Sequence, residues 1–342
     1  MTGWVLGIDS GGSGLRVALA RVADRDTVPV PVHTAAVDEP VRTGPSGIDA
    51  DHLLELVLPR VRHLLTAAAR EGGSGGGEGG SCRSADRSAP RIDAVCVGAA
   101  GMATLGGHLR ARLPGAFAGE LAVRHVALAA DAVTAYAGAL GERPGAVVAA
   151  GTGMIATGTD LRGWRRADGW GHLLGDCGGG AWIGRAGLEA ALRAHDGRPG
   201  GSTVLLARAE AVFGPVAGLP GKLYSRPDRP AVLASFAPEV ARCAGQDPVA
   251  ASVLAEAAVQ IAMSAAAVCP AGEDSRIALT GGLFRIGEPL LAPLREELAV
   301  RLPHARTAPA AGNPLAGALL IAVRLARGTL LLPPDPALLH LC

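Results

Sequence analysis

The sequence predicts an α/β protein built from two similar halves that face each other across a cleft. At 342 residues the chain is too long for one ordinary hydrophobic core, so two domains are expected. Two strand–turn–strand patterns with Gly-rich turns begin near residues 5 and 146, about 140 residues apart. Each is followed by strand-like runs that alternate with helical patterns, which is typical of α/β domains.

The first half is predicted to begin with a β-hairpin. Residues 5–8 and 15–22 are apolar and strand-like, and residues 9–14 are predicted as the Gly-rich turn between them. A third strand-like run covers residues 28–37.

A helix with one apolar face is predicted to begin at Asp49 or Asp51. Pro59 lies inside this pattern and is expected to kink or interrupt the helix. Residues 71–90 are rich in Gly and Ser and lack any apolar period, so they are predicted to form a flexible surface loop. A tolerated insertion is the better interpretation of this loop than a functional segment.

The rest of the chain is predicted to be mostly helical, with further strands near the motifs. The strand-like runs are residues 92–97, 121–128, 146–150, 155–159 and 276–279. One helix is predicted at residues 132–140 and another from near Pro314. We expect one domain at residues 1–128 and a second at residues 129–342, whose last helix, residues 313–326, can pack back on the first.

The composition excludes several classes of protein. Apolar residues make up 49% of the chain and charged residues 18%, which fits a well-buried globular protein rather than a disordered one. The net charge is +1 without a basic stripe, so no nucleic-acid partner is expected. Glu256, Gln260 and Ser264 interrupt the apolar stretch 249–268, so no membrane span is expected. The cysteines have no paired spacing and the N-terminus has no targeting pattern, so we expect a cytoplasmic protein.

The turn of the first hairpin reads Asp-Ser-Gly-Gly-Ser-Gly and can bind phosphate. Gly11 and Gly12 let the backbone approach an anion closely, and Ser13 adds a hydroxyl donor. Asp9, at the end of the strand, is placed to hold Mg²⁺ through water. The alternative is a tight turn in which Asp9 bonds its own backbone.

The second hairpin repeats this arrangement with Gly151, Thr152 and Gly153, where Thr152 is the hydroxyl donor. An ordinary short turn is again the alternative. Neither turn is a P-loop, because no Gly-Lys-Ser/Thr follows, and neither is a dinucleotide-binding fingerprint, because each leads into a strand.

Asp131 follows a predicted strand and begins a predicted helix. A carboxylate there can accept the proton of a substrate hydroxyl that attacks the γ-phosphate of a nucleotide. A helix N-cap is the competing interpretation, and the two roles are compatible.

Residues 169–184 form the densest motif, in which polar side chains stand beside aromatic rings among many glycines. This combination suits a sugar, whose rings present hydroxyls and apolar C–H faces. The candidate sugar-binding residues here are Gly169, Trp170, His172 and Asp176. An N-cap role for Asp176 and core packing for Trp182 are the alternatives.

Gly281 and Gly282 end the predicted strand at residues 276–279 and enter a helical pattern. Glycines there let the backbone lie flat against a planar ring such as adenine. A simple strand-to-helix turn is the alternative.

Taken in order, these motifs resemble those of the N-acetylglucosamine kinase branch of the benzoyl-CoA reductase/2-hydroxyglutaryl-CoA dehydratase-activating ATPase family. The resemblance extends from Gly7 to about Ala326. It implies two actin-like ATPase (ribonuclease H-like) domains flanking a nucleotide cleft, with ATP and Mg²⁺ as cofactors. It also implies an amino-sugar substrate and a homodimer.

The resemblance also implies roles for individual residues. The turn at residues 9–13 matches the first phosphate motif, and residues 151–153 match the second, which in this family also borders the sugar. Gly281 and Gly282 match the adenosine motif. Asp131 matches the general base for the 6-hydroxyl of the sugar, and Asp176 matches a sugar-contacting carboxylate.

Two positions depart from patterns found in the family. The loop at residues 41–52 lacks the Asn and Trp that the family's sugar kinases usually carry there. Val148 stands where the iron–sulfur activators of the family have a cluster-ligating Cys, which excludes that redox branch.

The sequence thus predicts an ATP-dependent kinase for an amino sugar, with N-acetylglucosamine as the first candidate. Glucosamine, N-acetylmuramic acid or another hydroxyl compound are the alternative substrates. A non-catalytic sensor of sugar or nucleotide, and an ATPase that drives a partner protein, are the alternative functions.

Overall fold

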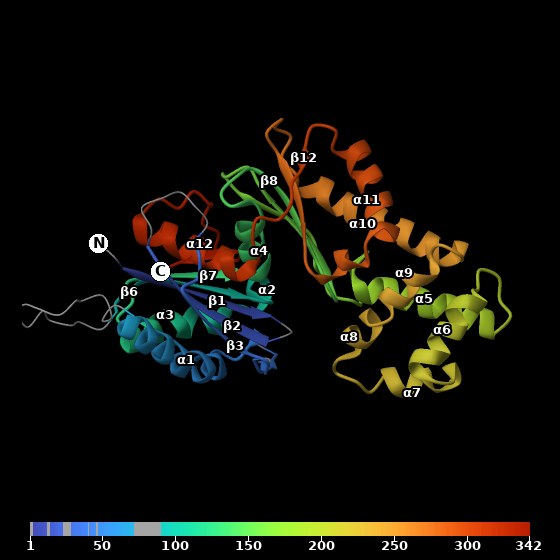
Figure 1. Cartoon of the computed structure of the whole chain (residues 1–342), viewed down its shortest axis with the longest axis horizontal. Helices are drawn as coiled ribbons and strands as arrows, with labels where there is room; N and C mark the ends of the chain where they lie inside the picture. The colour runs from blue at the N-terminus through green and yellow to red at the C-terminus, as the bar shows by residue number, and fades with distance from the viewer. Residues whose placement is uncertain (1–2, 12–13, 23–28, 40, 46, 72–89) are drawn as a thin grey trace, which may run out of the picture. The chain divides into compact units, whose positions relative to one another are not determined.

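The chain forms two compact units in the computed structural model, which describes residues 3–11, 14–22, 29–39, 41–45, 47–71 and 90–342. Unit 1 consists of Met1–Glu142, Leu161–Trp164 and Ala310–Cys342, and unit 2 of Arg143–Asp160 and Arg165–Pro309. Figure 1 shows both units coloured along the chain. Most of the Gly- and Ser-rich stretch predicted as a loop, residues 72–89, lies outside the described residues, as does Cys82.

The division of the chain differs from the predicted one at residue 128. Helix α4 (Asp131–Leu140) belongs to unit 1 because it packs against α12 (Pro314–Arg327) and against the sheet of that unit. This contact joins segments far apart in the sequence, which a local pattern does not reveal. The closing helix α12 also belongs to unit 1.

Unit 1 is built on a six-stranded sheet among the described residues, with strand order β13-β7-β6-β1-β2-β3. Strands β1 and β2 form an antiparallel hairpin, and β1, β6 and β7 are parallel. The strands are β1 (Trp4–Gly11), β2 (Gly14–Arg21), β3 (His33–Val37), β6 (Ile92–Ala99), β7 (His125–Ala130) and β13 (Leu339–Leu341). A separate short ribbon joins β4 (Thr43–Gly44) and β5 (Gly47–Ile48).

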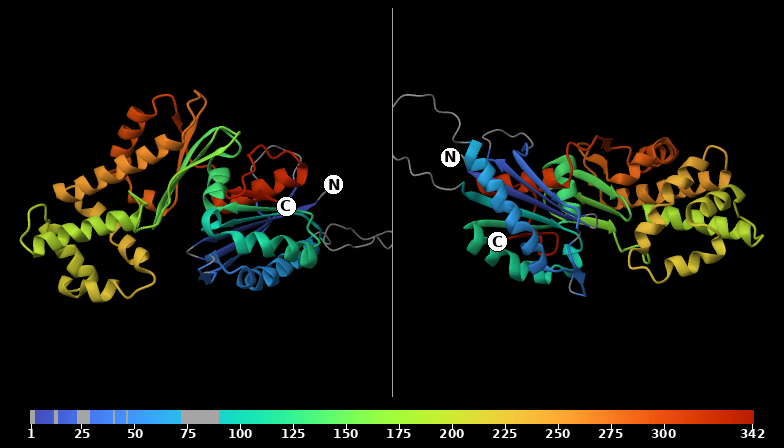
Figure 2. Two further views of the ribbon diagram at one scale, coloured as in Figure 1. Left: turned by 180° about the vertical axis from the view of Figure 1, so that it is seen from behind. Right: turned by 60° about the horizontal axis from the view of Figure 1, so that its bottom comes forward.

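Helices cover both faces of this sheet. In Figures 1 and 2, α1 (Ala50–Glu71) and α3 (Gly107–Leu121) lie on one face, and α4 and α12 lie on the other. The short helix α2 (Met102–Leu105) leads into α3. The carboxyl ends of the parallel strands are therefore flanked by helix termini, as in other α/β sheets that bind ligands at this edge.

Three predictions for unit 1 need correction. Strand β1 continues through Asp9 to Gly11, so the predicted turn at residues 9–14 is shorter than expected. The predicted strand at residues 121–128 begins only at His125, because Leu121 ends α3, a helix that the sequence did not reveal.

The third correction concerns Pro59, which does not interrupt α1. The buried side chains of Leu53, Val57 and Val61 pack this helix on the sheet, which offsets the hydrogen bond that the proline lacks. Asp49 caps the helix, since its Oδ1 accepts the backbone N–H groups of Asp51 and His52 at 3.0 and 3.2 Å.

Helices α4 and α12 approach each other through glycines. A β-carbon built on Gly317 would lie 1.9 Å from the carbonyl oxygen of Thr134, and one built on Gly138 would lie 2.2 Å from that of Asn313. Real β-carbons do not make such contacts with backbone atoms, so both positions require glycine. Since α4 begins at Asp131, this packing also fixes the position of that carboxylate.

We expect Gly317→Ala to destabilise unit 1 by about 2 kcal/mol or more, because the new methyl group overlaps the rigid backbone of α4. Gly115→Ala in α3 is the control, since its β-carbon meets no atom within 4 Å and alanine favours a helix. Thermal and urea unfolding of both variants measure the difference. Equal stability of the two variants would contradict the close packing of α4 on α12.

Unit 2 repeats the plan of unit 1. Its sheet has the strand order β10-β9-β8-β11-β12 among the described residues, which parallels β3-β2-β1-β6-β7 in unit 1. Strands β8 and β9 form an antiparallel hairpin, and β11 runs parallel to β8, as β6 does to β1. The repeat predicted from the two Gly-rich turns is thus present in the topology.

Helices make up most of the rest of unit 2, as predicted. The strands are β8 (Gly145–Ala150), β9 (Met154–Thr159), β10 (Trp164–Asp168), β11 (Arg276–Thr280) and β12 (Arg306–Thr307). The helices are α5 (Gly180–His195), α6 (Thr203–Phe213), η1 (Val216–Gly218), α7 (Leu219–Leu223), α8 (Arg229–Ala234), α9 (Ala237–Cys243), α10 (Pro248–Val268), η2 (Gly282–Ile286) and α11 (Glu288–Arg301).

Helix α10 is long and apolar enough to span a membrane by length and composition alone. The bent pair formed by α6 and residues 216–223 passes the same test only when taken together. In the structure α10 packs on α11, β9 and α9, and its buried residues belong to the hydrophobic core of unit 2. A core position accounts for its apolar sequence.

Candidate active site

In unit 1, Asp9 lies near the carboxyl end of the central strand β1. Its Oδ2 is 3.9 Å from Nη1 of Arg16, its register partner on β2. Burial raises the pKa of the Asp9 carboxyl, and the Arg16 guanidinium opposes that rise. Of the predicted phosphate-binding residues beside it, Gly11 ends β1, whereas Gly12 and Ser13 lie outside the described residues.

Asp131 is the first residue of α4 and follows directly on β7. Ala130 occupies the N-cap position of α4, so the competing interpretation of Asp131 as the N-cap is wrong. Its Oδ1 instead accepts the backbone N–H of Ala132 at 2.9 Å, and its carbonyl accepts the hydroxyl of Thr134 at 3.0 Å. A carboxylate in the first turn of a helix also interacts favourably with the helix dipole.

The pKa of Asp131 is raised to about 6. Burial is the main cause, and the neighbouring negative charge of Asp9 adds to it. The two carboxyls come together because β1, β6 and β7 are parallel neighbours, so their carboxyl ends meet at one edge of the sheet. A carboxylate with a pKa near 6 is basic enough to accept a proton and still ionised at pH 7.

In unit 2, the turn Gly151–Thr152–Gly153 joins β8 and β9. The N-terminus of α5 holds it, since the N–H groups of Gly180 and Ala181 donate to the carbonyls of Gly151 and Thr152 at 2.9 and 2.8 Å. The side chain of Thr152 is exposed. The sequence did not reveal this anchoring by α5.

The loop that follows β10 brings Asp176 to this turn. A β-carbon built on Gly153 would lie 2.3 Å from Oδ2 of Asp176, so this carboxylate oxygen lies against the backbone of the turn. The other oxygen, Oδ1, accepts the N–H of Gly171 at 3.0 Å. Within the described residues, Oδ2 accepts no hydrogen bond and is available to a ligand hydroxyl. Burial raises the pKa of the Asp176 carboxyl.

Asp176 is not the N-cap of the following helix. Helix α5 begins at Gly180 with Gly179 as its N-cap, three residues beyond Asp176. The carboxylate is therefore free of that role, and the carbonyl of Asp176 accepts the N–H of Gly179 at 2.9 Å.

The other predicted sugar-binding residues belong to the same loop. Trp170 is 63% exposed, and the guanidinium carbon of Arg166 lies 4.5 Å from the centre of its ring. His172 lowers the pKa of Asp176, although burial outweighs its effect, and Gly169 packs on Ile155 of β9. Trp182 lies in α5 and packs against the core of unit 2, which was the alternative interpretation for this tryptophan.

Gly281 joins β11 to η2, which begins at Gly282, as expected for a strand-to-helix turn. Gly281 has a φ of 105°, and a β-carbon built on it would lie 2.1 Å from the carbonyl oxygen of Ala150. Only glycine fits this place. The backbone of Gly281 therefore lies against the end of β8, directly before the turn at residues 151–153.

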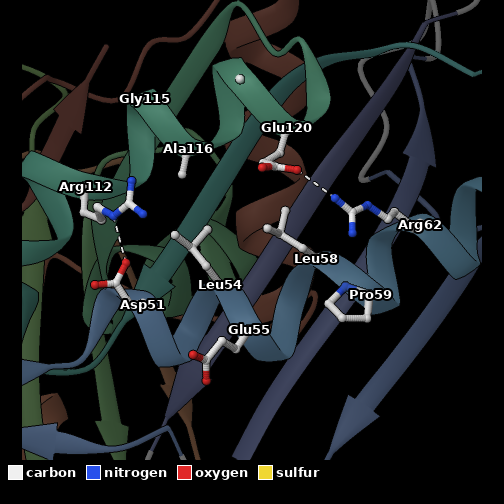
Figure 3. Close-up of a pocket in the computed structure, with 11 residues that line it drawn as sticks. Asp51, Leu54, Glu55, Leu58, Pro59, Arg62, Arg112, Gly115, Ala116 and Glu120 are labelled. Carbon is white, nitrogen blue, oxygen red and sulfur yellow. Dashed lines mark hydrogen bonds and ion pairs between the residues drawn. The ribbon is translucent and has the colours of Figure 1, made fainter.

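A groove of about 740 Å³ between α1 and α3 contains none of the predicted site residues. Figure 3 shows Leu54 and Leu58 lining it, with ion pairs Asp51–Arg112 at 2.8 Å and Arg62–Glu120 at 2.7 Å across it. The groove belongs to the outer face of the helices and is separate in the fold from Asp9 and Asp131 at the strand ends.

Comparison with solved structures identifies the fold as the two-domain actin-like ATPase fold. A Chromobacterium violaceum protein named for N-acetylglucosamine kinase activity is 27% identical, with a TM-score of 0.61 over 93% of this chain and 98% of its own. A ROK family glucokinase from Streptomyces griseus, solved with glucose and AMPPNP, is 21% identical. Its TM-score is 0.50 over 95% of this chain and 100% of its own, and this likeness shows the fold alone.

A curated relative and a family match complete the comparison. An N-acetylmuramic acid/N-acetylglucosamine kinase from Clostridium acetobutylicum is 43% identical over 76 residues, which span 22% of this chain and 24% of that protein. The match thus covers about a quarter of the relative. Residues 6–322 match the BadF/BadG/BcrA/BcrD ATPase family, and because this is nearly the whole chain, the protein belongs to that family.

Proposed function

We propose that this protein is an ATP-dependent kinase that phosphorylates an amino sugar, with N-acetylglucosamine as the first candidate and its 6-hydroxyl as the acceptor. The family match supports ATP as the phosphoryl donor. The relative from Chromobacterium violaceum, which is similar over nearly the whole chain, supports the sugar. N-Acetylmuramic acid is the second candidate substrate, since the curated relative is named for both sugars.

The observation that carries this proposal is the half-buried Asp131 at the junction of β7 and α4, with its carboxyl pKa raised to about 6. Its carboxylate has the basicity that a general base needs near neutral pH. In this role it accepts the proton of the sugar hydroxyl as that oxygen attacks the γ-phosphorus of ATP, and the bond to the leaving ADP oxygen breaks.

Asp9 is the proposed support for Mg²⁺. Mg²⁺ in such sites usually keeps several waters and is held by one or two carboxylates together with the phosphates of the nucleotide. The half-buried carboxylate of Asp9, whose pKa is raised by desolvation, suits this ion, because a nearby cation favours its charged form. Mg²⁺ supplies charge neutralisation for the phosphates of ATP.

The two turns and the glycine pair are the proposed nucleotide contacts. Gly11, Gly12 and Ser13 in unit 1 and Gly151, Thr152 and Gly153 in unit 2 bind the phosphates through backbone N–H and hydroxyl groups. Gly281 and Gly282 contact the adenosine, because a backbone without side chains leaves room for a planar ring.

Asp176 is the proposed sugar ligand in unit 2. Its available Oδ2 lies against Gly153, so a sugar hydroxyl that it binds is next to a phosphate-binding turn. Thr152, Gly169, Trp170 and His172 complete the proposed set, with the exposed ring of Trp170 offering a face for the C–H surface of a sugar. Asp131 contacts the reacting hydroxyl.

The proposed setting is the cytoplasm, where ATP is abundant and thiols stay reduced. The described cysteines, Cys96, Cys177, Cys243, Cys269 and Cys342, are free, which fits this setting. A homodimer is the proposed assembly.

The test is ADP release by the purified protein with Mg·ATP and one sugar at a time. The panel contains N-acetylglucosamine, N-acetylmuramic acid, glucosamine, glucose and a sample without sugar. Stimulation by one amino sugar well above the rate without sugar supports the kinase and names its substrate. Equal ADP release in all samples points to an ATPase that acts on a partner, and no ADP in any sample points to a sensor.

The rate should depend on pH through Asp131. Because its pKa is about 6 and the base must be ionised, kcat/KM should be constant above about pH 7 and fall about tenfold per pH unit below 6. The Asp9→Asn variant should have a lower rate at every pH, because it lacks the proposed support for Mg²⁺. Its decrease in kcat/KM should lie at lower pH than in the wild-type enzyme, since the substitution removes a negative charge that raises the Asp131 pKa. A decrease near pH 4 in the wild-type enzyme would rule out Asp131 as the base.

A further inference from the structure

The loop between β10 and α5 contains two aspartates in an unusual backbone conformation. Asp168 has a φ of 60° and Asp176 a φ of 54°. Among the described residues, only Ala122 and Leu161 are other non-glycine residues with positive φ. Residues with side chains avoid this left-handed region, although Asp tolerates it better than most. Such a conformation persists only where other contacts maintain it.

The side chain of Asp168 supplies these contacts. Its Oδ1 accepts the backbone N–H of Asp176 at 2.5 Å, and its Oδ2 accepts that of Cys177 at 2.9 Å. Hydrogen bonds to a charged carboxylate are stronger than those between neutral groups. The two oxygens of Asp168 thus accept hydrogen bonds from two successive backbone N–H groups, the first of which is that of Asp176 itself.

The fit around this carboxylate is close. A β-carbon built on Gly175 would lie 2.3 Å from Oδ1 of Asp168, so the residue before Asp176 leaves space for the bond. Gly171, whose N–H donates to Oδ1 of Asp176, has a φ of 85°. The backbone from Gly171 to Cys177 is therefore held from both ends, by Asp176 at one and by Asp168 at the other.

These bonds fix where the side chain of Asp176 points. The peptide orientation at Asp176 sets the direction of its side chain, which places Oδ2 against Gly153 in the phosphate-binding turn. Each carboxylate oxygen of Asp168 already accepts one backbone N–H group of this loop. Its effect on a ligand is therefore expected to pass through Asp176, whose backbone it holds.

We propose that Asp168 is the positioning residue that holds Asp176 in its sugar-binding conformation. This inference rests on the proposed function, since it assumes that Asp176 binds the sugar. This role could not be predicted from the sequence, because it depends on a contact between the backbone of Asp176 and a side chain eight positions earlier.

The experiment compares Asp168→Gly, Asp168→Asn, Asp176→Ala and the double variant Asp168→Gly/Asp176→Ala. Glycine at position 168 removes both acceptors but adopts a φ of 60° without strain, so the backbone itself is not the obstacle to folding. Asparagine keeps one acceptor oxygen. Ala122→Gly is the matched control, since it relieves the same kind of strain at the C-terminal end of α3.

Steady-state KM values for N-acetylglucosamine and for ATP are measured with each variant, together with thermal unfolding. Asp168→Gly should raise the KM for the sugar at least about tenfold and change that for ATP less than about twofold. Asp168→Asn should have a smaller effect of the same kind. In the Asp176→Ala background, Asp168→Gly should add less than about twofold, because residues that act through one group are not additive.

The possible outcomes distinguish failure of the positioning role of Asp168 from failure of the sugar-binding role of Asp176. If Asp176→Ala raises the KM for the sugar and Asp168→Gly does not, the positioning role is wrong and the proposed sugar site stands. If Asp176→Ala leaves the KM for the sugar unchanged, the sugar site is wrong and the role of Asp168 falls with it. Additive effects in the double variant would also overturn the inference. A purely structural role would lower the unfolding temperature without changing the KM of the folded enzyme.

Discussion

Replacement of Asp131 by asparagine should lower turnover at least about a hundredfold while leaving the affinity for ATP nearly unchanged. Asparagine has almost the same shape and still accepts the N–H of Ala132, but it cannot take a proton from the sugar hydroxyl. Single-turnover rates give the loss in the chemical step. Calorimetric titration with a non-hydrolysable ATP analogue gives the affinity. Unchanged turnover would show that Asp131 is not the base.

The same variant should be more stable than the wild-type protein at pH 8. The folded pKa of about 6 lies above the ordinary value of 3.8, so ionised Asp131 reduces stability fully above pH 6 and not at all below about pH 3.8. Removing the charge should therefore increase the free energy of unfolding at pH 8 by about 3 kcal/mol.

The control for this stability change is Asp196→Asn, at an exposed aspartate after α5 whose Oδ2 lies 3.0 Å from Nη2 of Arg198. It should change the free energy of unfolding by less than about 0.5 kcal/mol at every pH. The advantage of Asp131→Asn should shrink as the pH falls from 6 toward 4. An advantage that is the same at pH 4 and pH 8 would contradict the burial of an ionised carboxylate. A loss of activity together with a gain in stability is the pattern expected of a functional residue.

Gly153→Ala is expected to have the second large effect. The new methyl group would lie 2.3 Å from Oδ2 of Asp176, so either the turn or the carboxylate must move. Displacement by about 1 Å of groups that position a substrate can cost about a hundredfold in rate. We therefore expect kcat/KM for the sugar to fall about a hundredfold, with the KM for ATP also raised because the turn binds phosphate.

Gly245→Ala provides the comparison for this variant. It lies between α9 and α10, where a β-carbon meets no atom within 4 Å, and it should retain wild-type kinetics. The unfolding temperature of Gly153→Ala separates a local effect from loss of the fold. Wild-type kinetics in the Gly153→Ala variant would mean that Asp176 and the turn are not in contact.

Local patterns in the sequence were sufficient to predict the hairpins and the residues at the strand ends. The hairpins β1–β2 and β8–β9 could be predicted because each consists of two short apolar runs on either side of a Gly-containing turn. Asp131 could be found because a strand ends and a helix begins at one residue. The motif predicted at residues 169–184 contains Asp176, whose Oδ2 lies against Gly153 in the turn of the second hairpin.

Features that depend on distant contacts could not be predicted in this way. The boundary of unit 1 depends on the packing of α4 on α12, which are separated by all of unit 2 in the sequence. Strand β10, with the sequence Trp-Arg-Arg-Ala-Asp, has no apolar alternation and owes its conformation to its neighbour β9 in the sheet. Asp168 was missed because its function depends on a positive φ and on two backbone N–H groups.

The most direct test of the account is to identify the product. The protein is incubated with Mg·ATP and N-acetylglucosamine, and the sugar is examined by mass spectrometry and by phosphorus and proton NMR. We predict a monophosphate at the 6-hydroxyl, formed in equal amount to ADP and at least about a hundredfold more slowly with Asp131→Asn. ADP that forms without any phosphorylated sugar, from N-acetylglucosamine or from the other amino sugars of the panel, would contradict the assignment of this protein as an amino-sugar kinase.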